Sequence, residues 1–173
     1  IEKMQSNGWN YYDTLINIDT NAEKILVLAN DGHMPVYPTR GKFLPNATSL
    51  ALKNLENKNG FFLMVEGSQI DSYNHDNKLK EAAHEVYEFD KAIAVALEFA
   101  ANNPDTMIVI TADHETGGLQ KETNKENMNN SLYTSGNHTA ANVPLFCKNF
   151  TYSFQAEQQN TEVFQMCKTF LEL

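Results

Sequence analysis

The sequence is poor in positive charge. Thirteen lysine and arginine side chains stand against 22 aspartate and glutamate side chains, which gives a formal net charge of −9. Nucleic acids and anionic membrane surfaces are bound through basic patches, so we expect neither as a partner. An acidic protein that acts on an anionic substrate needs a local source of positive charge, and bound metal ions are one such source.

Cysteine and long apolar runs are also scarce. The two cysteines, Cys147 and Cys167, match no zinc-binding spacing, and the sequence does not assign them to a disulfide. No apolar stretch is long enough to span a bilayer. The sequence starts at Ile1 without a signal-peptide pattern, so we expect a piece of a longer protein whose targeting signals are not visible. Its 173 residues suit a single domain over 1–173.

The apolar residues that are present predict an α/β fold. Short apolar runs bounded by turn residues predict strands, here at residues 25–29, 61–65, 106–111 and 143–147. Apolar residues spaced three to four apart predict helices, here over residues 46–57 with a cap at Asn46, over 78–101, and over 160–173. We expect a mostly parallel sheet flanked by helices.

The apolar run at 61–65 is the central strand of the predicted sheet. It is a short, wholly apolar run entered through Gly60, so we expect a strand buried on both faces of a parallel sheet. With the long helix at 78–101 and the strand at 106–111 it forms a βαβ unit, which predicts parallel strands and a right-handed crossover. The polar stretch 119–135 is expected to be a surface excursion.

Acidic residues and histidines follow two of the predicted strands. Glu66, Asp71 and His75 come directly after 61–65, where the carboxyl end of a strand places functional groups in open α/β sheets. Asp71 and His75 are four residues apart, so one turn of helix directs both at one point. A carboxylate oxygen and an imidazole nitrogen there predict half of a divalent metal site, with zinc the leading candidate.

Two further metal-binding residues follow the strand at 106–111. Asp113 and His114 are adjacent, so they can share a metal only if the strand has already broken into a turn, which the nearby glycines permit. His138 lies in a later glycine-containing loop. Five such ligands suggest two metals about 3.5–4 Å apart, an arrangement used for phosphoryl transfer.

The remaining histidines fit this site less well. His84 lies inside the predicted long helix, away from any loop, and we expect a structural or exposed side chain. His33 follows the strand at 25–29, so geometry permits a ligand, but a satisfied turn residue is the more common case at such a position.

Three motifs in this order resemble the alkaline phosphatase family. They are FFLMVEGSQID with His75 and Asn77, VITADHETGG, and SGNHTAANVPLF. The resemblance extends from Asp31 to Phe146 and implies the carboxyl-terminal part of an alkaline-phosphatase-like three-layer sandwich. It also implies phosphomonoester hydrolysis through a phosphoserine, allows a homodimer, and points to a periplasmic or secreted parent.

The resemblance implies a role for each candidate ligand. Asp71, His75 and His138 would bind the first zinc, and Asp113 and His114 the second. Glu66 would be a magnesium ligand, which suits an oxygen donor.

Several residues that the family needs have no counterpart here. The nucleophilic serine, one bridging aspartate, a further magnesium ligand and the arginine that clamps phosphate would all lie upstream of this segment. Arg40 is the only arginine and does not match that clamp. Ser72 and Ser135 do not align with the nucleophile. We therefore expect the chain by itself to be inactive.

Two alternatives remain open from the sequence. The chain could be a metal-binding or assembly domain without catalysis. It could also belong to a metal-dependent phosphodiesterase, sulfatase or phosphoglycerate mutase of similar site architecture, although the loop that carries His138 favours the monoesterase.

Overall fold

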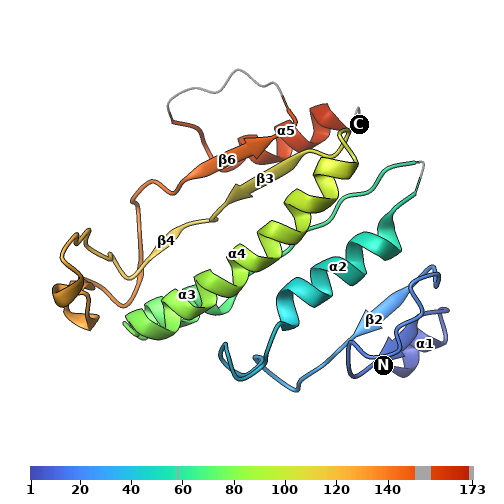
Figure 1. The fold of residues 1–173 in the computed structure, drawn as a ribbon, viewed down its shortest axis with the longest axis horizontal. Helices are drawn as coiled ribbons and strands as arrows, with labels where there is room; N and C mark the ends of the chain where they lie inside the picture. Colours follow the sequence, from blue (N-terminus) through green and yellow to red (C-terminus); the bar gives the residue numbers. More distant parts are fainter. Residues whose placement is uncertain (58, 151–156, 172–173) are drawn as a thin grey trace. The chain divides into compact units, whose positions relative to one another are not determined.

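The computed structural model describes residues 1–57, 59–150 and 157–171 and shows an α/β chain (Figure 1). The chain divides into two compact units, and each is described by itself. Unit 1 comprises Ile1–Ile70 and Lys80–Ala96, and unit 2 comprises Asp71–Leu79 and Leu97–Leu173. No helix within the described residues is both long enough and apolar enough to cross a membrane.

Unit 1 begins with a short helix and a parallel pair of strands. Helix α1 (Glu2–Gln5) precedes β1 (Asn10–Tyr12), which pairs in parallel with β2 (Ile25–Val27). The strand predicted at 25–29 is confirmed over these three residues. Gly8, with a φ of +82°, ends the helical segment in the left-handed conformation that glycine adopts at little cost.

Helix α2 (Phe43–Leu55) confirms the predicted helix but begins earlier than expected. Its N-cap is Lys42, so the prediction of a cap at Asn46 is wrong. Pro45 lies in the first turn, where the missing N–H of proline costs nothing because that turn has no intrahelical acceptor.

The segment 61–65 is not a strand, contrary to our prediction. Phe62 and Met64 are 63% and 72% exposed, whereas the alternate residues Phe61, Leu63 and Val65 are half-buried. The alternation is that of an extended chain with one covered face. Among the described residues the strand pairs form elsewhere, and residues 61–65 belong to none of them.

The longest helix, α4 (Leu79–Asn102), confirms the helix predicted over 78–101. Its portion in unit 1 buries Ala82, Glu85, Glu88 and Ala92, and leaves Val86 half exposed. Two carboxylates therefore occupy the covered face of the helix. Their partner is Arg40, whose guanidinium donates to Glu88 Oε2 over 2.7 Å and to Glu85 Oε1 over 3.1 Å.

Unit 2 is built from two antiparallel strand pairs. Strand β3 (Ile108–Thr111) pairs with β6 (Leu145–Lys148), and β4 (Glu115–Thr116) pairs with β5 (His138–Thr139). The strands predicted at 106–111 and 143–147 are confirmed. The predicted parallel βαβ unit is wrong, because residues 61–65 form no ladder and β3 pairs with the antiparallel β6.

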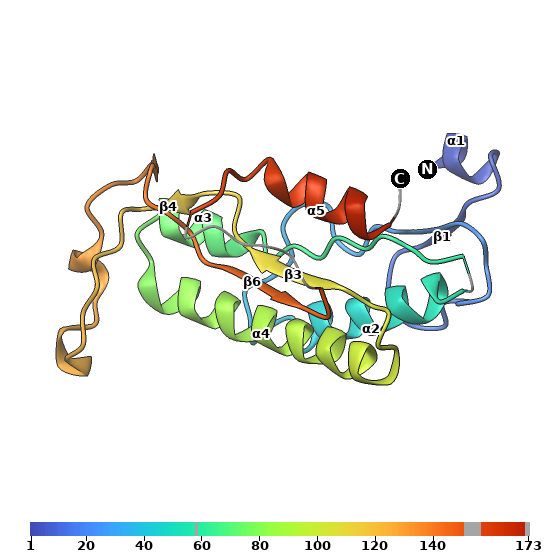
Figure 2. The same ribbon diagram turned by 90° about the horizontal axis from the view of Figure 1, so that it is seen from above.

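Short helices complete this unit. Helix α5 (Glu162–Phe170) runs along the β3–β6 pair and buries Met166 completely (Figure 2). Two single-turn helices, η1 (Lys125–Asn127) and η2 (Asn130–Leu132), lie in a stretch of mostly exposed residues between β4 and β5. The last helix covers nine of the residues predicted over 160–173, of which 172 and 173 lie outside the described residues.

Candidate metal centre

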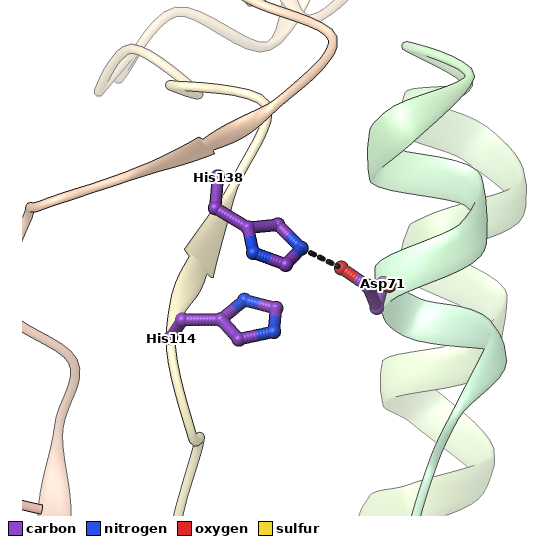
Figure 3. Close-up of side chains that lie close together, drawn as sticks. All are labelled: Asp71, His114 and His138. Carbon is purple, nitrogen blue, oxygen red and sulfur yellow. Dashed lines mark ion pairs between the residues drawn. The ribbon is translucent and has the colours of Figure 1, made fainter.

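Three elements of unit 2 bring acidic and histidine side chains together. Helix α3 (Gln69–His75) carries Asp71 and His75, the turn before β4 carries His114, and β5 carries His138. Figure 3 shows the rings of His114 and His138 facing the carboxylate of Asp71. One ligand atom from each of these three residues lies within 4.8 Å of the others.

Asp71, His75 and His138 have the spacing of ligands around a tetrahedral ion. His75 Nε2 lies 3.1 Å from His138 Nε2 and 3.4 Å from Asp71 Oδ2, and His138 Nε2 lies 3.6 Å from Asp71 Oδ1. Ligands bound at the usual zinc distances are about 3.3 Å apart at the edges of a tetrahedron. The two nitrogens and the Asp71 carboxylate, which approaches each nitrogen with a different oxygen, therefore have separations close to those of zinc ligands.

A hydrogen bond from the other ring nitrogen of His75 orients the ring so that Nε2 faces the cluster. Its Nδ1 lies 2.7 Å from the backbone oxygen of Gly136. A carbonyl oxygen can only accept, so Nδ1 carries a proton, and Nε2, which faces His138, is the ring nitrogen available to an ion. Metal-binding histidines commonly donate their other ring N–H in this way.

Asp113 and His114 form a second set. Both lie in the bend between β3 and β4, so the strand has broken where the sequence required it. His114 Nε2 is 3.3 Å from Asp113 Oδ2, and His114 Nδ1 is 3.1 Å from the hydroxyl of Thr116. With Nδ1 donating, Nε2 directs a lone pair at a carboxylate, and only a cation between them, a proton or a metal ion, makes that arrangement favourable.

The two sets adjoin. The rings of His114 and His138 stack with their centroids 3.5 Å apart, and the ring of His138 lies 4.9 Å from that of His75. The structure thus gathers five of the six predicted ligands, Asp71, His75, Asp113, His114 and His138, into one cluster. The cluster is open to solvent, since the Asp71 and His138 side chains are 42% and 49% exposed.

The other residues singled out in the sequence lie elsewhere. Glu66 belongs to unit 1, so its assignment as a magnesium ligand stays a prediction. His33 is exposed in a loop of unit 1, and His84 packs edge-on against Tyr37. Ser135 accepts a hydrogen bond from the backbone N–H of Asn137, as a turn residue does.

Sequence reasoning missed the residues that support this cluster. Thr116 contacts both Asp71 and His114, and Gly117 allows the ring of Tyr133 to pack directly against the backbone. Tyr133 donates from its hydroxyl to Asn74 on α3 over 2.6 Å, and burial raises the pKa of this phenol. Thr116 and Gly117 lie in the motif VITADHETGG, next to Asp113 and His114. This proximity was the one feature of the sequence that could have indicated their supporting role.

Comparison with known proteins decides the family. The family model described as alkaline phosphatase matches residues 1–162. This chain belongs to the alkaline phosphatase family. Among curated relatives, it is 33% identical to alkaline phosphatase 3 of Bacillus subtilis over 99% of this chain, and 39% identical to the repressible alkaline phosphatase of Saccharomyces cerevisiae over 69% of it.

Solved structures support the same fold. The alkaline phosphatase of the Antarctic bacterium TAB5 matches 84% of this chain with a TM-score of 0.71 and 34% identity. A variant of that enzyme with magnesium bound in its M3 site matches with a TM-score of 0.72. The chain spans 36% of the Bacillus relative and 46% of the TAB5 enzyme. The expected alkaline-phosphatase-like α/β fold, in partial form, is therefore confirmed.

Proposed function

We propose that the cluster on unit 2 is the metal centre of a phosphomonoester hydrolase. Asp71, His75 and His138 would hold one zinc ion, and Asp113 and His114 would hold a second. Glu66 would contribute to a magnesium site. The observation that carries this proposal is that His75 Nε2 and His138 Nε2 lie 3.1 Å apart and each lies 3.4–3.6 Å from an oxygen of the Asp71 carboxylate, separations close to those of ligands around one small ion.

The donor chemistry supports a hydrolytic zinc site over a structural one. Imidazole nitrogen with carboxylate oxygen is the ligand type of catalytic zinc, whereas structural sites use thiolates and are closed. Bound metal ions would supply charge stabilisation for a phosphoryl group and activation of the attacking oxygen. The residues of this chain hold the donors in place, and their exposure leaves an open coordination position that a substrate can reach.

The chain by itself should lack activity, because Arg40 is not free to clamp a phosphate. Its guanidinium is buried, with the side chain 7% exposed, and is bound by Glu85 and Glu88. Burial alone would lower the pKa of Arg40, but the hydrogen bonds and charges of the two glutamates raise it. The cation is therefore committed to the interior, and the phosphate-binding arginine and the nucleophile must come from elsewhere in the parent protein.

Zinc calorimetry combined with an assay of p-nitrophenyl phosphate hydrolysis tests this proposal. We expect tight zinc binding that is lost in His75→Ala, together with negligible turnover by the chain alone. Turnover at an enzymatic rate would show that the nucleophile lies within these residues, with Ser72 and Ser135 to be reconsidered. Zinc binding that is unaffected by His75→Ala would place the metal elsewhere and contradict the proposed centre.

A further inference from the structure

Thr116 occupies a central position in the cluster, although it is not one of the proposed ligands. Thr116 is only 8% exposed. Its hydroxyl lies 2.5 Å from Asp71 Oδ1 and 3.1 Å from His114 Nδ1. In the β4–β5 ladder it stands directly opposite His138. One buried hydroxyl thus contacts a residue of each proposed zinc set, Asp71 of the first and His114 of the second. The strand that carries it is paired with the strand of a third proposed ligand, His138.

The direction of these hydrogen bonds follows from counting protons. An ionised carboxylate only accepts, so the single hydroxyl proton of Thr116 is donated to Asp71. The hydroxyl oxygen is then left as an acceptor, and His114 must donate to it from Nδ1. The hydrogen bonds therefore require a proton on Nδ1 of His114. Its Nε2 lone pair faces Asp113, where the second ion would bind.

We propose that Thr116 is a positioning residue that couples the two metal sites, an inference that rests on the proposed function. Its hydroxyl selects the metal-binding tautomer of His114 and at the same time holds Oδ1 of Asp71. Because the same hydroxyl oxygen makes both hydrogen bonds, the orientation of Asp71 in the first site is coupled to the orientation of His114 in the second.

The side chain of threonine suits this task. Branching at Cβ restricts χ1, so the hydroxyl is held in one direction at the surface of a strand. Thr116→Val keeps the branching and the volume while removing the oxygen. Thr116→Ser keeps the oxygen and removes only a methyl group. The pair separates the hydrogen bonds from the packing.

The first measurement requires no metal. In ¹⁵N-labelled, metal-free protein, the imidazole nitrogen shifts of His114 report which nitrogen carries the proton. We expect a proton on Nδ1 in the wild type and in Thr116→Ser, with or without a second proton on Nε2, and loss of that preference in Thr116→Val. An Nε2–H tautomer in the wild type would overturn the proposal, and this result can be obtained even if Thr116→Val fails to fold.

The second measurement is zinc affinity by competition with a chelator. Loss of a hydrogen-bonding residue behind metal ligands typically weakens binding about 10–100-fold, so we expect Thr116→Val to weaken the binding of both ions and Thr116→Ser to restore most of it. Thr139→Val is the matched control, because this threonine lies in the same ladder but bonds to Glu115 and not to the proposed ligands.

The outcomes distinguish the two proposals. If zinc binds nowhere while the tautomer depends on Thr116, the proposed metal centre fails and the hydroxyl still orients His114. If zinc binds and His75→Ala abolishes it, but Thr116→Val changes neither the tautomer nor the affinity, the centre stands and the role of Thr116 is refuted. Equal losses in Thr116→Val and Thr139→Val would also refute it, because they would indicate general damage to the ladder.

Discussion

The protein contains two clusters of polar and charged side chains. In one the negative charges are matched by hydrogen-bond donors, and in the other they are not. In unit 1, Arg40 is enclosed with Glu85 and Glu88. The backbone N–H groups of Tyr37 and Leu44 donate to Oε1 of Glu85 over 3.0 Å and to Oε1 of Glu88 over 3.1 Å. In unit 2, the cluster of Asp71, His75, His114 and His138 directs lone pairs and negative charge at one another.

The difference separates a structural cluster from a candidate binding site. Every carboxylate oxygen in the buried group has a donor, so the group fixes the loop that contains Arg40 to helix α4 and leaves nothing for a ligand to satisfy. The exposed cluster is short of positive charge at its centre, and a cation would supply what it lacks. Variants can test each side of this contrast.

The largest effect on stability should come from Arg40→Met. It leaves two carboxylates buried without their cation, and breaking a buried pair in this way typically costs about 3–5 kcal/mol. Lys42→Met removes a positive charge from an exposed position only two residues away and should change the free energy of unfolding by less than about 0.5 kcal/mol. Urea unfolding followed by circular dichroism measures both, and similar losses would contradict a structural role specific to Arg40.

His75→Ala should have the largest effect on zinc. Removing one of three protein ligands should weaken binding at least about 100-fold, which is roughly 2.7 kcal/mol. Without metal its stability should hardly change, because the side chain is 36% exposed and fills no core position. His84→Ala, which removes a histidine of unit 1, should keep full zinc affinity in the same titration.

Gly117→Ala should cost roughly 1–3 kcal/mol of unfolding free energy. Gly117 has a φ of +91°, and an added Cβ would lie 2.6 Å from a ring carbon of Tyr133. Its backbone also accepts from Thr134 and Ser135, which lead the chain toward His138. Gly118→Ala is not a suitable control, since its φ is also positive. Gly32→Ala, whose Cβ would meet open space, should be nearly neutral in thermal unfolding.

The smallest effect should come from Tyr133→Phe. The ring stays buried, and only the hydrogen bond from its hydroxyl to Asn74 is lost, which typically costs about 1 kcal/mol. Zinc affinity should change less than in His75→Ala, because Asn74 orients helix α3 without binding the ion. A loss of zinc as large as that of His75→Ala would show that this contact controls the site itself.

The sequence predicted which acidic and histidine side chains lie together better than it predicted the sheet. Asp71 and His75 depend on one turn of helix, and Asp113 and His114 on a strand end, so local periodicity and motif were sufficient. The strand at 61–65 was predicted wrongly because a strand depends on neighbours that a local apolar run does not reveal.

Contacts between distant residues explain the remaining errors. Nothing in the sequence around Glu85 and Glu88 shows that both turn inward, because their partner Arg40 lies more than forty residues away. The apolar spacing therefore predicted helix α4 without showing that two glutamates occupy its covered face while Val86 is left half exposed. The role of Thr116 was hidden for the same reason, since it follows from contacts made after folding.

X-ray absorption at the zinc edge of the zinc-loaded protein tests the central claim most directly. The cluster on unit 2 predicts a first shell of nitrogen and oxygen at about 2.0–2.2 Å with histidine scattering and no sulfur. A sulfur shell at about 2.3 Å would contradict it, because zinc would then be bound by Cys147 or Cys167. So would a protein that retains no zinc under conditions in which it is folded.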